Sequence, residues 1–336
     1  MDVVGPPLDA SALAGKPAPA GQPQLRTKLP RIGVLAPGCA PPSPVLEVFL
    51  QGLRVRGYVE DQTLTIEWRY AEGRVERFPA LAAELVRLPV DLIVAVSTPA
   101  ALAAQQAMAT IPVVMVYVAD PVGTGLVPSL ARPGGNLTGV SDMATDLSAK
   151  RLELLKEAVP TLSRVAVLWN AADPGMVLRF REIEAAGRAL GVRLHSHEVH
   201  GPEEFEPAFA AMAQERPDAL FVVAEVLTLT HRCRILDFAA RHRLPAMYEF
   251  GLFAREGGLM AYGPKLTDTF ERASYYVDKL LNGGKPDELP VEQPMSFELV
   301  INLKTAEALG LALPPSLLLQ AERGDRGQEQ RCARVW

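Results

Sequence analysis

The sequence predicts an α/β fold of two Rossmann-like lobes, each built on a parallel sheet. From Arg31 onward, short runs of apolar and β-branched residues alternate with longer amphipathic segments, which is typical of a sheet covered by helices on both faces. The alternation starts again after a long helix near residues 146–160. At 336 residues the chain can form two domains that each bury a core. We therefore expect two similar halves, joined near residues 142–146.

In the first half, predicted strands and helices alternate regularly. The strands are 31–37, 63–71, 91–96, 111–118 and 136–141, and the helices are 43–58, 75–88 and 99–109. Gly57 closes the first helix, as glycine commonly does.

The second half repeats this pattern. The segments that follow it supply about one further βα unit for each of the two halves. The strands are 163–170, 192–199, 218–225 and 244–249, the helices are 146–160, 175–191, 202–217 and 227–243, and the added segments are 257–264, 267–286, 292–302 and 303–314. If the chain crosses back to the first half near residue 258 and returns near 291, two or three crossovers link the halves. Lobe 1 is then 31–143 plus 258–290, and lobe 2 is 144–257 plus 291–320. Such a linkage gives a hinge, with a cleft at the carboxyl ends of the strands.

Both ends of the chain read as irregular. Residues 1–30 are rich in Pro, Ala and Gly without periodicity, which predicts a disordered leader rather than a signal peptide. Residues 321–336 are polar and aperiodic, so we expect a disordered tail.

Composition excludes several classes of function. The 34 basic and 39 acidic residues give a net charge of −5, and without a basic stripe nucleic acid is not an expected partner. No apolar run approaches the roughly 18 to 20 residues of a membrane span. The three cysteines have neither zinc-ligand nor disulfide-framework spacing. Alternation places His195 and His197 on one face of a strand. Two interpretations of this pair are open, a metal site and a solvent-exposed strand edge.

The stretch Ser97-Thr98-Pro99-Ala100 lies where the third predicted strand meets its helix. Thr98 can cap the helix, Pro99 suits its first turn, and the amides of Ala100 and Ala101 remain free, which together predicts a cradle for a small anion. A plain helix cap explains the residues equally well. A nucleophile elbow would need glycine on both sides of the serine, and a phosphate loop would need a Gly-rich run ending in Lys-Ser or Lys-Thr. Neither pattern is present.

Other strand ends add polar and aromatic side chains to the same rim. Asp120 can meet a ligand or cap its own turn, two roles that the sequence leaves equal. The ends of the second-half strands carry Trp169, Asn170, Glu225, Tyr248, Glu249 and Tyr262. Carboxylates opposite an anion cradle suit a ligand with a carboxylate and an ammonium group, and the rings suit a flat or apolar side chain. Each residue is also compatible with simple packing at the rim.

Four long strings resemble the substrate-binding proteins of ABC transporters, similar to the tryptophan- and tyrosine-type binding proteins. These strings are "GYVEDQTLTIEWRYAEGRVERFPALAAELVRLPVDLIVAVSTPAA", "IPVVMVYVADPVGTGLVPSLARPGGNLTGVS", "KRLELLKEAVPTLSRVAVLWN" and "LPVEQPMSFELVINLKTAEALGL". The resemblance covers about residues 31–320. It implies a type I periplasmic-binding fold with three crossovers and a ligand trapped by hinge closure. By this resemblance Ser97, Thr98, Asp120 and Ser141 correspond to cleft positions of the first lobe, and Trp169, Asn170, Glu225, Tyr248 and Glu249 to those of the second.

The resemblance also implies a periplasmic protein that needs no cofactor or metal, catalyses no reaction and works as a monomer with a membrane permease. Its expected ligand is a small, amino-acid-like solute that carries a carboxylate and can be aromatic. A cytoplasmic sensor of the same fold is one alternative, and an α/β transferase is the other. For the transferase, Glu225 and Glu249 would need a second reactive group opposite them, and the sequence offers none.

Overall fold

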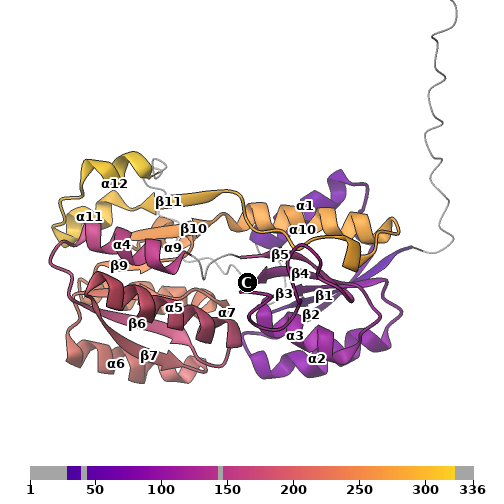
Figure 1. Cartoon of the computed structure of the whole chain (residues 1–336), viewed down its shortest axis with the longest axis horizontal. Helices are drawn as coiled ribbons and strands as arrows, with labels where there is room; N and C mark the ends of the chain where they lie inside the picture. The colour runs from indigo at the N-terminus through magenta and orange to yellow at the C-terminus, as the bar shows by residue number, and fades with distance from the viewer. Residues whose placement is uncertain (1–28, 39–43, 143–146, 322–336) are drawn as a thin grey trace, which may run out of the picture.

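The computed structural model describes residues 29–38, 44–142 and 147–321, which form two lobes lying side by side along the long axis of the molecule (Figure 1). Lobe 1 contains β1 (Arg31–Ala36), α1 (Pro44–Val55), β2 (Thr65–Tyr70), α2 (Phe78–Arg87), β3 (Leu92–Val96), α3 (Thr98–Ala107), β4 (Val113–Val118), β5 (Leu137–Ser141) and α10 (Leu266–Leu281). Lobe 2 contains α4 (Ser148–Ala158), β6 (Arg164–Asn170), α5 (Pro174–Leu190), β7 (Arg193–Val199), α6 (Phe205–Glu215), β8 (Ala219–Val222), α7 (Val226–Thr230), α8 (Arg232–Arg241), β9 (Ala246–Tyr248), α9 (Gly251–Arg255), β10 (Met260–Pro264), β11 (Phe297–Ile301), α11 (Leu303–Leu309) and α12 (Pro315–Gln320).

The two sheets have the parallel character that the apolar runs predict. The sheet of lobe 1 has the order β2-β1-β3-β4-β5 and is parallel throughout. The sheet of lobe 2 has the order β11-β10-β9-β8-β6-β7, in which β11 runs antiparallel to β10 and the other pairs are parallel. All carboxyl ends of the parallel strands in a sheet meet at one edge, so both lobes present such an edge.

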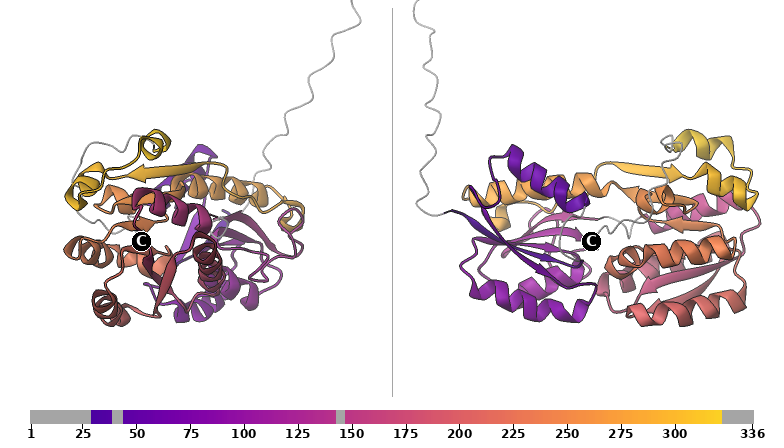
Figure 2. Two further views of the ribbon diagram at one scale, coloured as in Figure 1. Left: turned by 60° about the vertical axis from the view of Figure 1, so that its left-hand side comes forward. Right: turned by 180° about the vertical axis from the view of Figure 1, so that it is seen from behind.

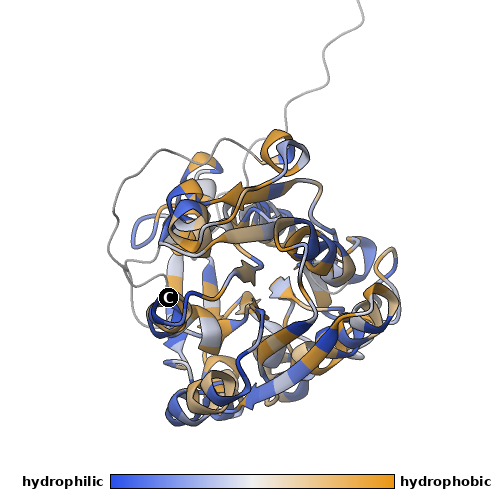
Figure 3. Ribbon diagram, turned by 90° about the vertical axis from the view of Figure 1, so that its left-hand side faces the viewer, coloured by the Kyte–Doolittle hydropathy of each residue, from blue (hydrophilic) through white to orange (hydrophobic). Residues whose placement is uncertain are grey.

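Alternating side chains of the strands explain why helices cover both faces of each sheet. In β1, Val34 packs with α1 and α10 on one face, while Leu35 packs with α2 and α3 on the other. In β6, Leu168 faces the side of α6 and α8, and Val167 faces α4 and α5. Successive side chains of a strand point to opposite faces of the sheet, so a strand without polar residues is buried on both faces. In Figure 3 the helices carry both hydrophobic and hydrophilic colours, as amphipathic helices that cover a sheet do.

Three crossovers join the lobes, and Figure 2 shows the two that connect α10 of lobe 1 with β10 and β11 of lobe 2. The first follows β5, the second leads from β10 into α10 at Lys265, and the third leads from α10 to β11. The second crossover comes later than residue 258, where the sequence places it, because β10 is a strand of the lobe 2 sheet. In the third, Glu292 is fixed to lobe 1 by two 2.6 Å contacts with Arg272 and by a bridge to Val140.

Several local features differ from the sequence-based expectations. The helix expected at 227–243 is divided into α7 and α8 at His231, and α9 and α12 are additional short helices. The cysteine spacing gives no indication of a disulfide, but Cys233 at the start of α8 is disulfide-bonded. The expected leader and tail lie almost wholly outside the described residues. Among the helices that are described, none combines the length and apolar character needed to cross a bilayer.

Candidate functional site

The carboxyl-terminal edges of the two sheets face each other, and the lobes touch there. Gly175, in the first turn of α5, lies so close to lobe 1 that a Cβ at this position would be 2.8 Å from Ala119 Cβ and 3.0 Å from Thr98 Oγ1. Both Thr98 and Ala119 are buried. Because α3 and α5 approach each other through their first turns, the structure is that of a closed cleft.

On lobe 1, Ser97 has the features of a ligand contact more clearly than its neighbours. It has φ 94°, a region that side-chain-bearing residues rarely adopt, and its buried Oγ has no hydrogen-bond partner in the described structure. Thr98 does not cap α3, because its Oγ1 accepts a hydrogen bond from the Ala119 amide at 3.0 Å. Pro99 and the buried Ala100 lie in the first turn. The amide of Ala101 is not free, since it donates to the Ser97 carbonyl.

The two remaining lobe 1 candidates have local partners. Asp120 caps its own turn, with Oδ1 accepting from the Gly123 amide at 2.8 Å. Ser141 is buried at the end of β5, and its Oγ donates to the Glu292 carbonyl of the third crossover at 3.3 Å. Ser141 therefore joins two hinge segments.

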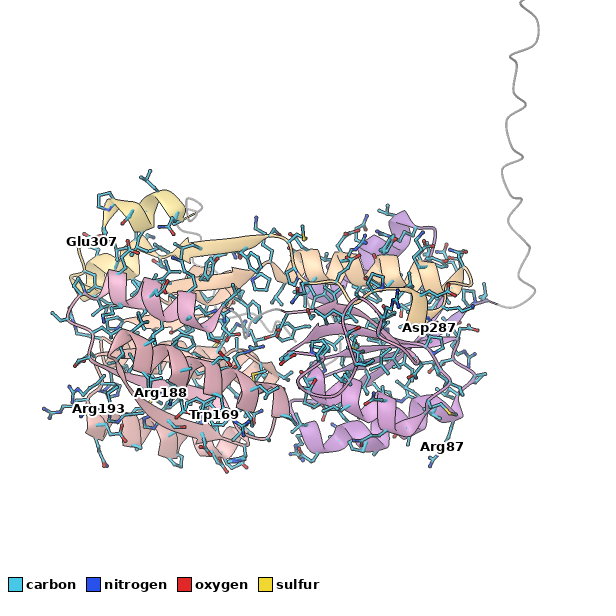
Figure 4. All side chains as sticks on the ribbon, in the orientation of Figure 1. Arg87, Trp169, Arg188, Arg193, Asp287 and Glu307 are labelled. Carbon is cyan, nitrogen blue, oxygen red and sulfur yellow. The ribbon has the colours of Figure 1, made fainter. Side chains whose placement is uncertain are left out.

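On lobe 2, Asn170 and Glu225 form a buried polar unit at the edge of the sheet. The Glu225 carboxylate accepts from the amides of Leu227 and Thr228 in a capping box that begins α7, and from Asn170 Nδ2 at 3.1 Å. Trp169, which is labelled on lobe 2 in Figure 4, points away from this unit, because alternation along β6 directs it toward α5. There its ring stacks on Phe180, with the ring centroids 4.6 Å apart. Its location favours the packing interpretation.

The last three candidates lie around β9 and β10. The Tyr248 ring stacks on Phe253 at 4.7 Å, and its buried hydroxyl has no partner in the described part of the chain. Tyr262 is half-buried, and its carbonyl accepts from Arg151 Nε at 2.7 Å. Glu249 is fully buried between two guanidinium groups, with Arg179 Nη1 at 2.6 Å and Arg151 Nη1 at 3.4 Å.

These two arginines belong to a buried cluster that the sequence analysis missed. Arg179 also contacts Asp142, at the end of β5, with Nη2 2.5 Å from Oδ2. Arginine inside an amphipathic helix is ordinarily exposed, so the sequence pattern did not predict a buried position for Arg151 or Arg179. A usable signal exists, since Arg179 lies on the helix face of Met176 and Ile183, at the spacing of the buried apolar residues.

Electrostatics explains why this cluster is tolerated. Burial alone would lower the pKa of Arg179, but the carboxylates of Asp142 and Glu249 outweigh burial and raise it, so the guanidinium stays charged. Two arginines and two carboxylates can balance each other, and a buried charge is stable only when it is paired in this way.

Asp173, which the sequence analysis also missed, caps α5 beside the lobe contact. Its Oδ1 accepts from the Gly175 amide at 2.8 Å. Burial, and after it the neighbouring carboxylate of Glu225, raises the pKa of Asp173 to about 7. The carboxyl group is therefore poised to gain or lose a proton near neutral pH.

Replacing Asp173 by asparagine should flatten the pH dependence of stability. The native carboxyl holds its proton more tightly than the unfolded one, so its contribution to stability is complete below about pH 4 and is lost as the pH rises through about 7. Between these values wild type should lose up to about 1.4 kcal/mol per pH unit relative to Asp173→Asn, which keeps a capping oxygen. Urea denaturation at pH 5, 6, 7 and 8 measures this. Asp237→Asn, at an exposed position, is the control, and parallel pH profiles for wild type and Asp173→Asn would contradict the prediction.

Two other features lie away from the cleft. A pocket of about 210 Å³, lined by Leu53, Tyr58 and Ile66 among others, opens at the amino-terminal end of β2, the opposite edge of the sheet. His195 and His197 both contact Glu215, but no group of side chains within the described ranges is arranged to hold a metal ion.

Comparison with known proteins gives a consistent assignment. The family model described as "ABC transporter substrate binding protein" matches residues 45–324. A tyrosine-binding protein of Clostridioides difficile (strain R20291) is 26% identical over 264 residues, covering 78% of this chain and 75% of the relative. An ABC domain from Streptococcus pneumonia in complex with L-Trp is 25% identical with TM-score 0.79, covering 88% of this chain and 99% of that one.

A conserved domain protein from Vibrio cholerae is similarly close, at 26% identity and TM-score 0.81, with coverage of 88% and 99%. The two lobes with parallel sheets are those of type I periplasmic-binding proteins, which confirms the expected fold. None of these comparisons tests the individual site residues, which therefore remain predictions.

Proposed function

Because the chain belongs to the family of ABC transporter substrate-binding proteins, we propose that it captures a small carboxylate-bearing solute between its lobes and delivers it to an importer permease. The family binds solutes, so the chain is not an enzyme. We further propose that the ligand is an aromatic L-amino acid and that the protein works in the periplasm. The ligand class draws on the tyrosine-binding and L-Trp-bound relatives.

The observation that carries the proposal is the meeting of the two sheet edges at Gly175, beside a buried serine hydroxyl that has no partner. A buried hydroxyl without a hydrogen bond is costly, and a ligand oxygen supplies the missing partner. The first turn of α3 lies beside Ser97 and favours negative charge. We therefore place the ligand carboxylate at Ser97.

The amine of the ligand belongs on the opposite lobe. Asp173 and Glu225 are buried carboxyl groups near the contact, and each interacts electrostatically with the other. A ligand ammonium would relieve their mutual repulsion. Glu249 is less suited to this role than the sequence suggested, because both of its oxygens already contact cationic guanidinium groups, whereas the donors to Glu225 are neutral amides.

A thermal-shift screen tests the ligand class. At 100 times its dissociation constant, a true ligand should stabilise the protein by about 2.7 kcal/mol and raise Tm. We expect this from L-tryptophan or L-tyrosine, and a smaller shift from indole-3-lactate, which lacks the amine. If none of the aromatic amino acids raises Tm, the proposed ligand class is wrong.

Ser97→Ala, measured in the same screen, tests whether the ligand carboxylate lies at Ser97. Alanine is no more strained than serine at φ 94°, so the variant removes only the hydroxyl. Losing one hydrogen bond to a charged group should weaken binding by tenfold or more. Ser129→Ala, in an exposed loop, is the matched control and should bind as wild type does. Equal affinities for the two variants would remove Ser97 from the site.

A further inference from the structure

The buried ionisable side chains at the facing sheet edges carry more negative than positive groups. Among the described residues, six are almost fully buried there and interact with one another electrostatically. Four are carboxyl groups and two are guanidinium groups, contributed by α4, α5, the start of α7 and the ends of β5 and β9: Asp142, Asp173, Glu225, Glu249, Arg151 and Arg179. With all six ionised, four negative charges would face two positive ones in a region that solvates charge poorly.

The two arginines are already in contact with two of the carboxylates. Arg179 contacts both Asp142 and Glu249, and Arg151 contacts Glu249 from its other oxygen. These four side chains balance one another. The excess negative charge of the cluster therefore falls on the other two carboxyl groups.

Asp173 and Glu225, which make up this remaining pair, accept hydrogen bonds from neutral donors. Asp173 Oδ1 accepts from the Gly175 amide, and the Glu225 carboxylate accepts from Asn170 Nδ2 and from two amides at the start of α7. Arg179 attracts both carboxylates, but its guanidinium already contacts two others. Neutral donors stabilise a carboxylate without removing its charge, so the two groups of the pair repel each other.

A proton relieves this repulsion in the closed structure. Burial, and after it the charge of Glu225, raises the pKa of Asp173 to about 7, with Arg179 acting against the change and Asp142 adding to it. Burial also raises the pKa of Glu225, although the amides that donate to it act in the opposite direction. Below about pH 7 the closed pair therefore holds a proton when no other cation lies beside it.

We propose that closing the cleft requires one positive charge beside Asp173 and Glu225, which a ligand ammonium supplies and which a proton supplies when the ligand has no amine. The inference rests on the proposed function, in which the ligand amine lies against these two carboxyl groups. It makes the preference for amines over amine-free analogues depend on pH. Above about pH 7 an analogue without the amine leaves both carboxylates charged, whereas at lower pH the cleft closes over it with a proton taken from the solvent.

Titration calorimetry with L-tryptophan and indole-3-lactate at pH 5, 6, 7 and 8 tests this inference. Both compounds keep their own charges over this range, so a pH-dependent difference between them arises in the protein. The complex with indole-3-lactate should hold one proton more than the complex with L-tryptophan. The affinity for L-tryptophan divided by that for indole-3-lactate should therefore be constant above pH 7 and fall by up to about tenfold for each pH unit below it.

Asp173→Asn removes one charge of the pair and keeps a capping oxygen, so the change in this ratio between pH 5 and pH 7 should shrink at least about threefold. Asp237→Asn, at an exposed position, is the control and should keep the wild-type pH dependence. A wild-type ratio that is the same at all four pH values would overturn the inference, as would a full pH dependence that survives in Asp173→Asn. If neither compound binds at any pH, the proposed ligand class is itself wrong and the inference falls with it, so the two failures can be told apart.

Discussion

Arg179→Met is expected to lower the free energy of unfolding by about 3 to 5 kcal/mol, the cost of breaking a buried ion pair from one side. The substitution keeps most of the side-chain volume but leaves Asp142 and Glu249 buried without the guanidinium that contacts both. Arg151 lies 3.4 Å from Glu249 and compensates only in part. Urea denaturation followed by circular dichroism measures the loss.

Two further variants separate charge pairing from packing. Arg181→Met changes an exposed arginine of the same helix and should alter stability by no more than about 0.5 kcal/mol. Adding Glu249→Gln to Arg179→Met removes one of the stranded charges and should restore part of the lost stability. If Arg179→Met proves no worse than Arg181→Met, buried charge pairing does not stabilise this cluster.

The fold could be predicted from the sequence because its strands are buried on both faces. Runs such as Leu92–Val96 contain no polar residue, and helices of suitable length follow them. The crossing at Lys265 was harder to place, because the local pattern of β10 is that of any strand. Whether β10 pairs in lobe 1 or lobe 2 depends on contacts with β9 and β11, which no local pattern encodes.

The candidate site was only partly predictable, for a similar reason. Ser97 was identified because strand-to-helix junctions have a local signature, in which a hydroxyl precedes a helix-starting proline. Trp169 was grouped with the rim because it comes next to last in its strand, but the pleat directs its ring toward Phe180. Arg151 and Arg179 become a cluster only when α4 and α5 pack beside β9, a tertiary effect.

Gly175→Ala is expected to weaken ligand binding by tenfold to a hundredfold while leaving the ligand-free protein at least as stable. The added methyl would lie 2.8 Å from Ala119 Cβ, so full closure would require overpacking that typically costs about 1 to 3 kcal/mol. In the open form this methyl meets no part of lobe 1. Alanine is moreover a better helix former than glycine, by up to about 1 kcal/mol. Titration calorimetry with the ligand found in the screen and thermal denaturation without it measure the two effects.

The opposite signs of these effects make the prediction specific to closure. A substitution that simply damaged the fold would lower both affinity and Tm, whereas one that blocks the contact between α5 and lobe 1 lowers affinity alone. Adding Ala119→Gly removes the nearest atom, so the double variant should regain part of the affinity, and the remaining deficit reflects Thr98 Oγ1 at 3.0 Å. Unchanged affinity in Gly175→Ala would mean that the ligand is held without the lobes meeting at this point. A lower Tm without ligand would instead show that Gly175 serves the folding of α5 rather than the closing of the cleft.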